Sequence, residues 1–135
     1  MSINKSFYPV ELPLNKGDSG QLVVMEHASH IPFLVKRAFI IANVPAGKER
    51  GNHANIHSQF FMVCLSGSCK VTIDDGICNE NFLLDKCHMG LYMDKMKWKT
   101  MSDFSEDCIL LVLSDCLYDK SEYISDYDKF RAFSL

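Results

Sequence analysis

The stretch RGNHANIHSQ at residues 50–59, followed directly by the apolar run FFMVCL at residues 60–65, decides how this sequence is interpreted. In an extended strand the side chains alternate between the two faces, so every second residue from His53 through Asn55 and His57 to Gln59 is expected on one face. Four polar groups on that face are costly against a dry core. The stretch therefore predicts a strand that either lines a polar cavity or has a solvated outer face.

Short segments rich in β-branched and aromatic residues recur on both sides of this stretch, with turn signals between them. Asp74-Asp75-Gly76 is typical of a hairpin turn, because the pair Asp-Gly tolerates the positive φ of a tight turn. The strands are expected at residues 21–26, 33–42, 58–65, 69–73, 77–84, 89–93 and 108–113. So many strands without intervening helices predict an antiparallel sandwich or barrel.

The C-terminal stretch from Asp119 to Phe133 differs, because its aromatic residues recur at helical spacing. Asp119 and Glu122 have the spacing of an N-terminal capping box. We therefore expect one amphipathic helix packed on the outside of an otherwise all-β chain. Residues 1–135 contain no linker or repeat and are interpreted as a single domain.

The composition of the chain excludes some classes of binding partner and indicates where the protein is located. The formal net charge of −3 over 135 residues argues against nucleic acid or an anionic membrane as the main partner. There is no apolar run of membrane-spanning length, and the N-terminus lacks the apolar region of a secretory signal, so a cytoplasmic location is expected. Six scattered cysteines without a metal-finger spacing are interpreted as mostly buried, reduced thiols.

The order of these segments resembles the two motifs of a cupin jelly-roll barrel: a polar histidine strand, a glycine turn, a hairpin, and a strand that reaches Tyr92. This resemblance implies that the polar face of residues 50–59 lines a cavity. Metal-binding cupins carry His-x-His-x-x-x-Glu in the first motif and another histidine in the second. Here the corresponding residues are His53, Asn55, Gln59 and Lys99. Because only one of the four ligands is retained, and a lysine repels a cation, we expect neither a metal nor another cofactor.

A more specific resemblance runs along nearly the whole chain. The sequence is similar to the dTDP-4-keto-6-deoxyglucose 3,4-ketoisomerases of bacterial surface-glycan synthesis. The residues that carry this resemblance are Ile31-Pro32-Phe33 with Lys36-Arg37, Arg50-Gly51-x-His53-Ala54, Val63-Cys64-Leu65-x-Gly67-Ser68-Cys69, Asp74-Asp75-Gly76, Gly90-Leu91-Tyr92, Trp98, Asp103-Phe104-Ser105-x-Asp107-Cys108 and Tyr118-Asp119-x-x-x-Tyr123-Ile124.

The resemblance implies a homodimer with exchanged N-terminal strands, each subunit binding one dTDP-linked 4-keto-6-deoxy sugar. It also implies that the ketone moves from C4 to C3 through an enediol by histidine acid/base catalysis, and that the product feeds an aminotransferase. His53 matches the first histidine of the family's site, and Tyr92 matches a tyrosine near it. Arg37 and Arg50 match arginines that face the pyrophosphate. Beside Arg50, Gly51 permits close approach of the backbone to a ligand.

The sequence departs from the family where a second histidine is Asn55, where a histidine after the tryptophan is Lys99, and where Arg-Gly reads Ser19-Gly20. Asn55 can hydrogen-bond an enediolate, Lys99 can stabilise its charge, and His57 is a stand-in base. We therefore expect His53, Asn55, His57 and Lys99 to be catalytic. Arg37, Arg50, Gly51, Tyr92 and Gln59 are expected to bind the substrate.

These departures leave two alternatives to the isomerase. The chain could be a weak or inactive dTDP-sugar-binding paralogue, or it could catalyse a related epimerisation through an enediol. The sequence does not determine whether the product has the gluco or the galacto configuration at C4.

Overall fold

A computed structural model describes residues 6–134 and shows an all-β chain with one short C-terminal helix, as the sequence predicts. The strands are β1 (Phe7–Glu11), β2 (Leu14–Gly17), β3 (Gly20–Val23), β4 (Arg37–Ala42), β5 (Arg50–Asn55), β6 (Phe60–Ser66), β7 (Cys69–Asp74), β8 (Asn79–Leu84), β9 (Met89–Met93), β10 (Trp98–Ser102), β11 (Ile109–Ser114) and β12 (Tyr123–Ile124). A 3-10 turn η1 (Lys120–Glu122) precedes β12, and α1 (Tyr127–Ser134) follows it. Among these residues no helix has the length and apolar character needed to cross a bilayer.

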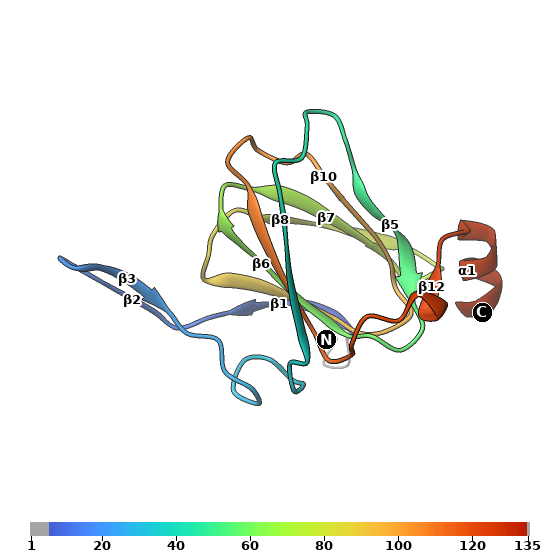
Figure 1. Cartoon of the computed structure of the whole chain (residues 1–135), viewed down its shortest axis with the longest axis horizontal. Coiled ribbons are helices and arrows are strands. Elements are labelled where there is room, and N and C mark those ends of the chain that lie inside the picture. Colours follow the sequence, from blue (N-terminus) through green and yellow to red (C-terminus); the bar gives the residue numbers. More distant parts are fainter. Residues whose placement is uncertain (1–5, 135) are drawn as a thin grey trace.

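Two five-stranded antiparallel sheets face each other (Figure 1). One has the order β1-β9-β6-β11-β4, and the other has the order β12-β5-β10-β7-β8. The remaining strands, β2 and β3, pair only with each other. The two large sheets of the described residues do not join into one closed ring, so the expected barrel takes the form of a sandwich. Its core lies between the sheets and is built from alternate residues of the facing strands, among them Phe60, Met62, Cys64, Cys69, Val71, Ile73, Leu110 and Val112.

The outer face of the β6 sheet is also covered. Phe61 and Val63 point to this side, where Leu12, Ile31 and Phe33 pack over them. Burial on both faces explains why β6 reads as a continuous apolar run and not as an alternating one. It also explains why the expected strand at residues 33–42 begins only at Arg37: the residues before it form the cover.

The predicted turn at Asp74-Asp75-Gly76 is confirmed. Strands β7 and β8 pair up to Asp74 opposite Asn79, and Gly76 has a φ of 97°. The Asp75 carboxylate accepts hydrogen bonds from the next backbone N–H groups, those of Ile77 and Cys78. An aspartate that satisfies the free donors of its own turn is the physical reason for the sequence signal.

The expected helix from Asp119 to Phe133 is wrong in its first half. Asp119 does cap a helical turn, since its carboxylate accepts from the Ser121 N–H, but that turn is only η1. Glu122 does not fold back to complete the capping box; it turns inward toward β5, and Tyr123 pairs with Asn55 in β12. Tertiary pairing overrides the helical pattern until α1 begins at Tyr127.

Candidate active site

A cavity of about 400 Å³ lies between the two sheets, bordered by β4, β5, β6, β10 and β11 and by the segment around η1. Its polar lining residues are the cations and the histidine Arg37, Arg50, Lys99 and His53, together with the tyrosines Tyr118 and Tyr123. The rest of the lining is largely apolar, with Phe39, Ile41, Phe60, Met62, Met101 and Val112. An apolar cavity with a few convergent polar groups is the usual form of a small-molecule site. Of the two alternatives left by residues 50–59, the structure selects the cavity.

His53 lies in β5 with its ring against Tyr123, the ring centroids being 4.7 Å apart. Its Nδ1 is 3.1 Å from the carbonyl oxygen of Gly51. Because a carbonyl only accepts, Nδ1 must donate, and the neutral ring then has its lone pair on Nε2. Burial, followed by the positive charge of Lys99, lowers the pKa of His53 to about 4. His53 is therefore a neutral proton acceptor at physiological pH.

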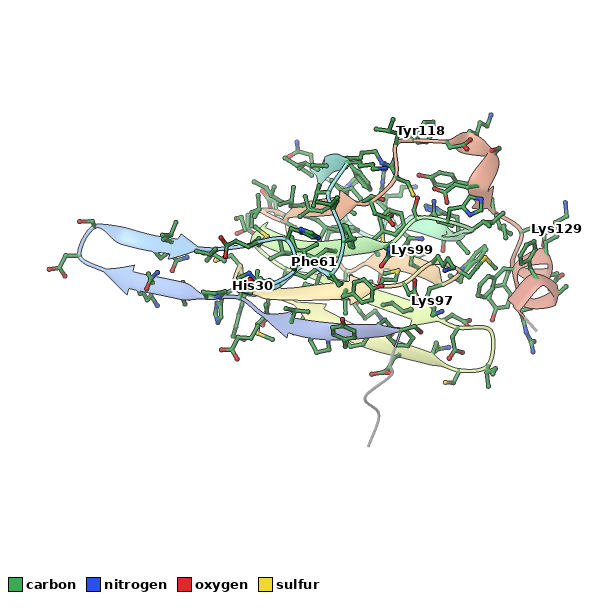
Figure 2. All side chains as sticks on the ribbon, turned by 90° about the horizontal axis from the view of Figure 1, so that it is seen from below. His30, Phe61, Lys97, Lys99, Tyr118 and Lys129 are labelled. Carbon is green, nitrogen blue, oxygen red and sulfur yellow. The ribbon has the colours of Figure 1, made fainter. Side chains whose placement is uncertain are left out.

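Lys99 is the most deeply buried cation of the cavity wall, with only 3% of its surface exposed. It lies on β10 directly opposite His53 in the strand pairing, and Figure 2 shows its side chain between the sheets. The Nζ donates to Asn55 Oδ1 at 2.8 Å and lies 4.7 Å from the centre of the Phe60 ring. Burial lowers the pKa of Lys99 to about 7, although the charge of Glu122 opposes that shift.

Asn55 lies behind Lys99 and does not line the cavity. Its side chain is 1% exposed, and its Nδ2 donates to Glu122 Oε2 at 3.2 Å. Both ends of the amide are therefore engaged with charged groups. Asn55 is in the site as expected, but it reaches the cavity through Lys99.

Gly51 brings β5 close to β10. A Cβ at this position would lie 2.8 Å from the backbone oxygen of Lys99, and the φ of 91° disfavours any other residue. The strand pairing shifts register here, between Lys99 and Thr100. The expected close approach of the Gly51 backbone is thus first of all an approach to Lys99, beside the cavity that Gly51 also lines.

Arg37 supplies a second cation to the cavity, from the start of β4. Its guanidinium lies between two rings, 5.3 Å from the centre of Phe39 and 5.7 Å from that of Tyr118. Nε and Nη2 are buried and have no hydrogen-bond partner in the part of the chain that the structure describes. Buried charged donors are normally paired, so these atoms indicate a place for an anion. Arg50 lines the same cavity from the exposed start of β5.

Two expected site residues lie elsewhere because β5 ends at Asn55. The alternation that was to continue through His57 and Gln59 stops there. His57 is exposed and does not line the cavity; its backbone N–H donates to Glu122 Oε1. Gln59 also lies outside the cavity lining, with its side chain bound to Asp115 at 2.8 Å. The expectation that all four polar residues share one face is therefore wrong for these two.

Tyr92 is likewise outside the cavity lining. It points to the outer face of the β6 sheet, where it packs with Phe33 and Tyr8, and its hydroxyl donates to Gln59 Oε1 at 2.6 Å. Within β9 it is the neighbouring Leu91 that faces the core. The expected contact of Tyr92 with substrate does not fit this placement.

Three residues of the site were not expected from the sequence. Tyr118 and Tyr123 line the cavity, and Glu122 anchors Asn55 beneath it. Glu122 and Tyr123 come from the segment interpreted as helical, whose aromatic residues were assigned to packing, and Tyr118 directly precedes that segment. The family pattern Tyr118-Asp119-x-x-x-Tyr123 was the signal in the sequence that pointed to the two tyrosines, whereas Glu122 was expected only as part of the capping box.

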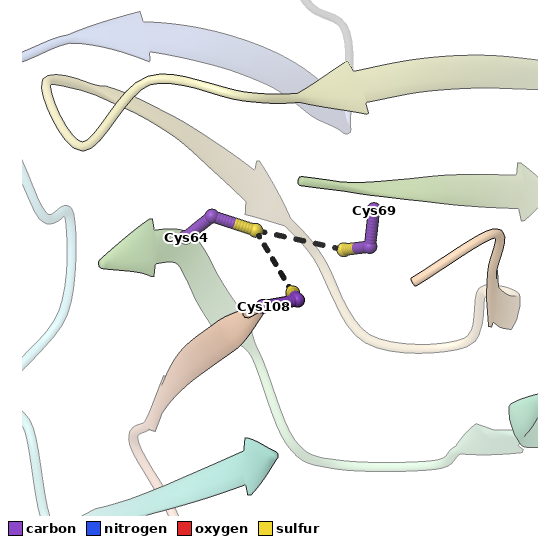
Figure 3. Close-up of side chains that lie close together, drawn as sticks. All are labelled: Cys64, Cys69 and Cys108. Atoms are coloured by element: carbon purple, nitrogen blue, oxygen red, sulfur yellow. Dashed lines mark hydrogen bonds between the residues drawn. The ribbon is translucent and has the colours of Figure 1, made fainter. Parts of the chain in front are cut away.

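Three buried thiols form a separate group in the core (Figure 3). The Sγ of Cys64 is 3.7 Å from those of both Cys69 and Cys108. A hydrogen bond with Cys69 and burial raise the pKa of Cys64, and burial raises that of Cys108 to about 12. The three side chains pack as small apolar groups in the core, as predicted. The prediction is wrong for Cys78, which is exposed, and Cys87 and Cys116 are half-buried.

Known proteins match this chain along most of its length. The model of the family described as FdtA, WxcM-like, C-terminal, matches residues 6–134. A TDP-4-oxo-6-deoxy-alpha-D-glucose-3,4-oxoisomerase from Aneurinibacillus thermoaerophilus is 40% identical over 114 residues, which cover 84% of this chain and 82% of that protein.

Solved structures agree with these matches. WlaRA, a TDP-fucose-3,4-ketoisomerase from Campylobacter jejuni, is 38% identical with a TM-score of 0.92 over 97% of each chain. The 3,4-ketoisomerase QdtA from Thermoanaerobacterium thermosaccharolyticum is 29% identical with a TM-score of 0.92, covering 96% of this chain and 94% of that one. That QdtA structure is a variant with asparagine in place of one histidine, in complex with TDP-4-keto-6-deoxyglucose.

Proposed function

The chain belongs to the FdtA family, and from that premise we propose that it is a sugar 3,4-ketoisomerase acting on dTDP-4-keto-6-deoxyglucose. The observation that carries the proposal is the pairing of a neutral, proton-accepting His53 with the Lys99 cation beside it in one cavity wall. Moving a ketone to the neighbouring carbon needs a base for a carbon-bound proton and a positive charge for the oxygen that becomes negative.

In the proposed reaction, His53 removes the proton from C3 of the sugar. The electrons of that C–H bond form a C3–C4 double bond, and those of the C4 carbonyl pass to its oxygen. The enediolate that results is stabilised by the ammonium group of Lys99. A proton then returns to C4, and the proton of the C3 hydroxyl passes to the C4 oxygen, which leaves the ketone at C3 and a hydroxyl group at C4. No redox partner is required, because oxidation at C3 balances reduction at C4.

The diphosphate is proposed to lie against Arg37 and Arg50. A guanidinium makes charge-assisted, bidentate bonds to phosphate oxygens, and the buried Nε and Nη2 of Arg37 offer such a pair of donors. The flanking Tyr118 ring and the Phe39 ring hold the guanidinium in place. The apolar part of the lining suits the C6 methyl group and the sugar ring.

We further propose that the protein acts as a cytoplasmic homodimer with exchanged N-terminal strands, supplying a 3-keto sugar to an aminotransferase of surface-glycan synthesis. The support for the dimer lies in the hairpin of β2 and β3, which extends away from the sandwich (Figure 1). A two-stranded hairpin is marginal alone. Leu22 on this hairpin is 59% exposed, as expected of a surface that a second subunit covers.

The deciding experiment incubates the protein with dTDP-4-keto-6-deoxyglucose in deuterated buffer and follows the sugar protons by NMR. Loss of the C3 proton together with a new 3-keto sugar supports the isomerase, and the coupling constants give the C4 configuration. Deuterium uptake without movement of the ketone would indicate an epimerase instead. A substrate that stays unchanged would contradict both.

One observation keeps the binding-only alternative in view: His53 is the one histidine that lines the cavity among the described residues. Restoring the family pattern with Asn55→His and Lys99→His separates the two cases. A binding-only protein should gain activity in the double variant, whereas an enzyme that relies on Lys99 should lose it. Raised melting temperature with dTDP serves as the control for binding in both proteins.

A further inference from the structure

Glu122 carries a deeply buried carboxylate, although it does not line the cavity of the site. Only 2% of its surface is exposed, and burying an unpaired carboxylate is very costly. It is stabilised by four donors from the end of β5 and the turn after it: Asn55 Nδ2, the backbone N–H groups of His57 and Ser58, and the Ser58 hydroxyl. Burial raises the pKa of Glu122, but these hydrogen bonds outweigh it and hold the pKa below its ordinary value.

An ionised Glu122 fixes the orientation of the Asn55 amide. A carboxylate only accepts hydrogen bonds, so the amide must turn its Nδ2 toward Glu122, at 3.2 Å. The Oδ1 then faces the opposite way and accepts from Lys99 Nζ at 2.8 Å. An ammonium group only donates, so the reverse orientation of Asn55 would lose both bonds. The hydrogen bonds from Glu122 through Asn55 to Lys99 are therefore compatible with only one orientation of the Asn55 amide.

The ionisable groups around Lys99 set its charge. His53 faces it from β5 and Glu122 from η1. Its pairing partner on β7 is Ile73, and β6 places the Phe60 ring near its Nζ, so neither of these contacts adds a charge. Arg37 and Arg50 line the same cavity. Glu122 is thus the one carboxylate near Lys99 among the described residues. Its charge opposes the lowering of the Lys99 pKa by burial.

We propose that Glu122 is a positioning residue of the isomerase site: through the Asn55 amide it holds the Lys99 ammonium at the cavity wall beside His53, and its charge keeps that ammonium protonated. This rests on the proposed function, in which Lys99 stabilises the enediolate. Glu122 touches no substrate. Its effect is transmitted through one side chain, over one hydrogen bond on each side.

The test is Glu122→Gln, compared with Asp119→Asn as the matched control. Both variants change a carboxylate to an amide in the same short segment, but Asp119 is exposed and bonds only within its own turn. In Glu122→Gln the alkaline limb of the kcat profile should move about one pH unit lower, at the low end of what one opposite charge contributes. At pH values above the alkaline limbs of both proteins, kcat of Glu122→Gln should then be about tenfold lower than that of the wild type. Asp119→Asn should follow the wild type, and Glu122→Asp should keep the wild-type limb.

A second readout needs no turnover: the pH titration of the Lys99 side chain by NMR in the ligand-free protein, assigned with Lys99→Met. The Lys99 pKa should fall in Glu122→Gln and stay in Asp119→Asn. If neither the limb nor the titration moves, the proposal is overturned. A wild type without isomerisation would instead refute the proposed function, while the titration still decides what Glu122 does to Lys99. Should Glu122→Gln fail to fold, Asn55→Ala breaks the same link, and its Lys99 titration must also shift downward.

Discussion

Lys99 Nζ and Asn55 Oδ1 lie 2.8 Å apart, so the two residues that depart from the family's histidines are in contact with each other. The asparagine accepts a hydrogen bond from the lysine, and the lysine places an ammonium group where the family has an imidazole ring. A site with one histidine and one buried ammonium can still divide the work between a base and a charge-stabilising group.

Replacing His53 should lower kcat strongly, whereas the same replacement of His57 should leave kcat nearly unchanged. His53→Asn removes the proposed base from the cavity and should lower kcat by about 10³-fold, within the range of general-base catalysis. His57→Asn alters an exposed side chain outside the cavity lining, and kcat should stay within about twofold. Steady-state rates of ketone migration measure both effects. A large loss of kcat in His57→Asn would contradict the assignment of His53 as the base.

Replacing Arg37 should raise the stability of the ligand-free protein and weaken its binding of dTDP. Arg37→Met removes two buried donors that have no partner among residues 6–134, so the ligand-free protein should melt at a higher temperature. The same variant should bind dTDP about 10- to 100-fold more weakly, because charge-assisted bonds to phosphate are lost. Calorimetry and thermal melts measure the two effects. Lys36→Met, a neighbouring exposed cation, is the control and should change neither. Unchanged dTDP affinity in Arg37→Met would exclude Arg37 from the diphosphate site.

The pH profile of kcat/KM should be displaced to low pH. The free enzyme needs neutral His53, whose pKa is lowered to about 4, and charged Lys99, whose pKa is lowered to about 7. Activity should therefore rise as pH increases through about 4 and fall as it increases through about 7. An acid limb near the ordinary histidine value of about 6.5 would contradict the buried, Lys99-facing position of His53.

Stability should also depend on Lys99. Its pKa is about 7 in the folded protein and 10.5 ordinarily, so between these values the unfolded chain holds a proton that the folded one has released. The free energy of unfolding should therefore rise with pH in this window, by about 2 kcal/mol from pH 7 to 8.5. Below pH 7 both states are protonated and the penalty is complete. Denaturant unfolding of Lys99→Met should lack this rise; equal slopes in the two proteins would refute it.

The hairpin of β2 and β3 should mediate self-association. Leu22→Glu places a charge on its exposed apolar surface and should shift the protein from dimer to monomer in sedimentation equilibrium. Asp18→Glu, at the tip of the same hairpin, keeps the charge and should leave the dimer intact. A wild-type monomer at micromolar concentration would contradict the proposed dimer.

Local signals in the sequence were sufficient to predict a structure where neighbouring residues supply the hydrogen bonds or the apolar pattern that forms it. Asp75 satisfies the donors of the hairpin turn it forms, and the apolar residues 60–65 form a strand wherever the sheet places them. Such features depend on neighbours in the chain, so composition and spacing reveal them. His53 was predicted in the site on a different ground, the resemblance of Arg50-Gly51-x-His53-Ala54 to the family's motif.

The sequence by itself determined the all-β class, the hairpin turn, the family and the residues His53, Arg37, Arg50 and Lys99 of the cavity. Only the tertiary structure decided which side of a strand faces that cavity. Both sides of the β6 sheet are buried, so alternation could not tell that Tyr92 points away. Nor could it tell that Glu122 leaves its helical pattern, because the donors that stabilise this carboxylate lie 64 to 67 residues away in the chain.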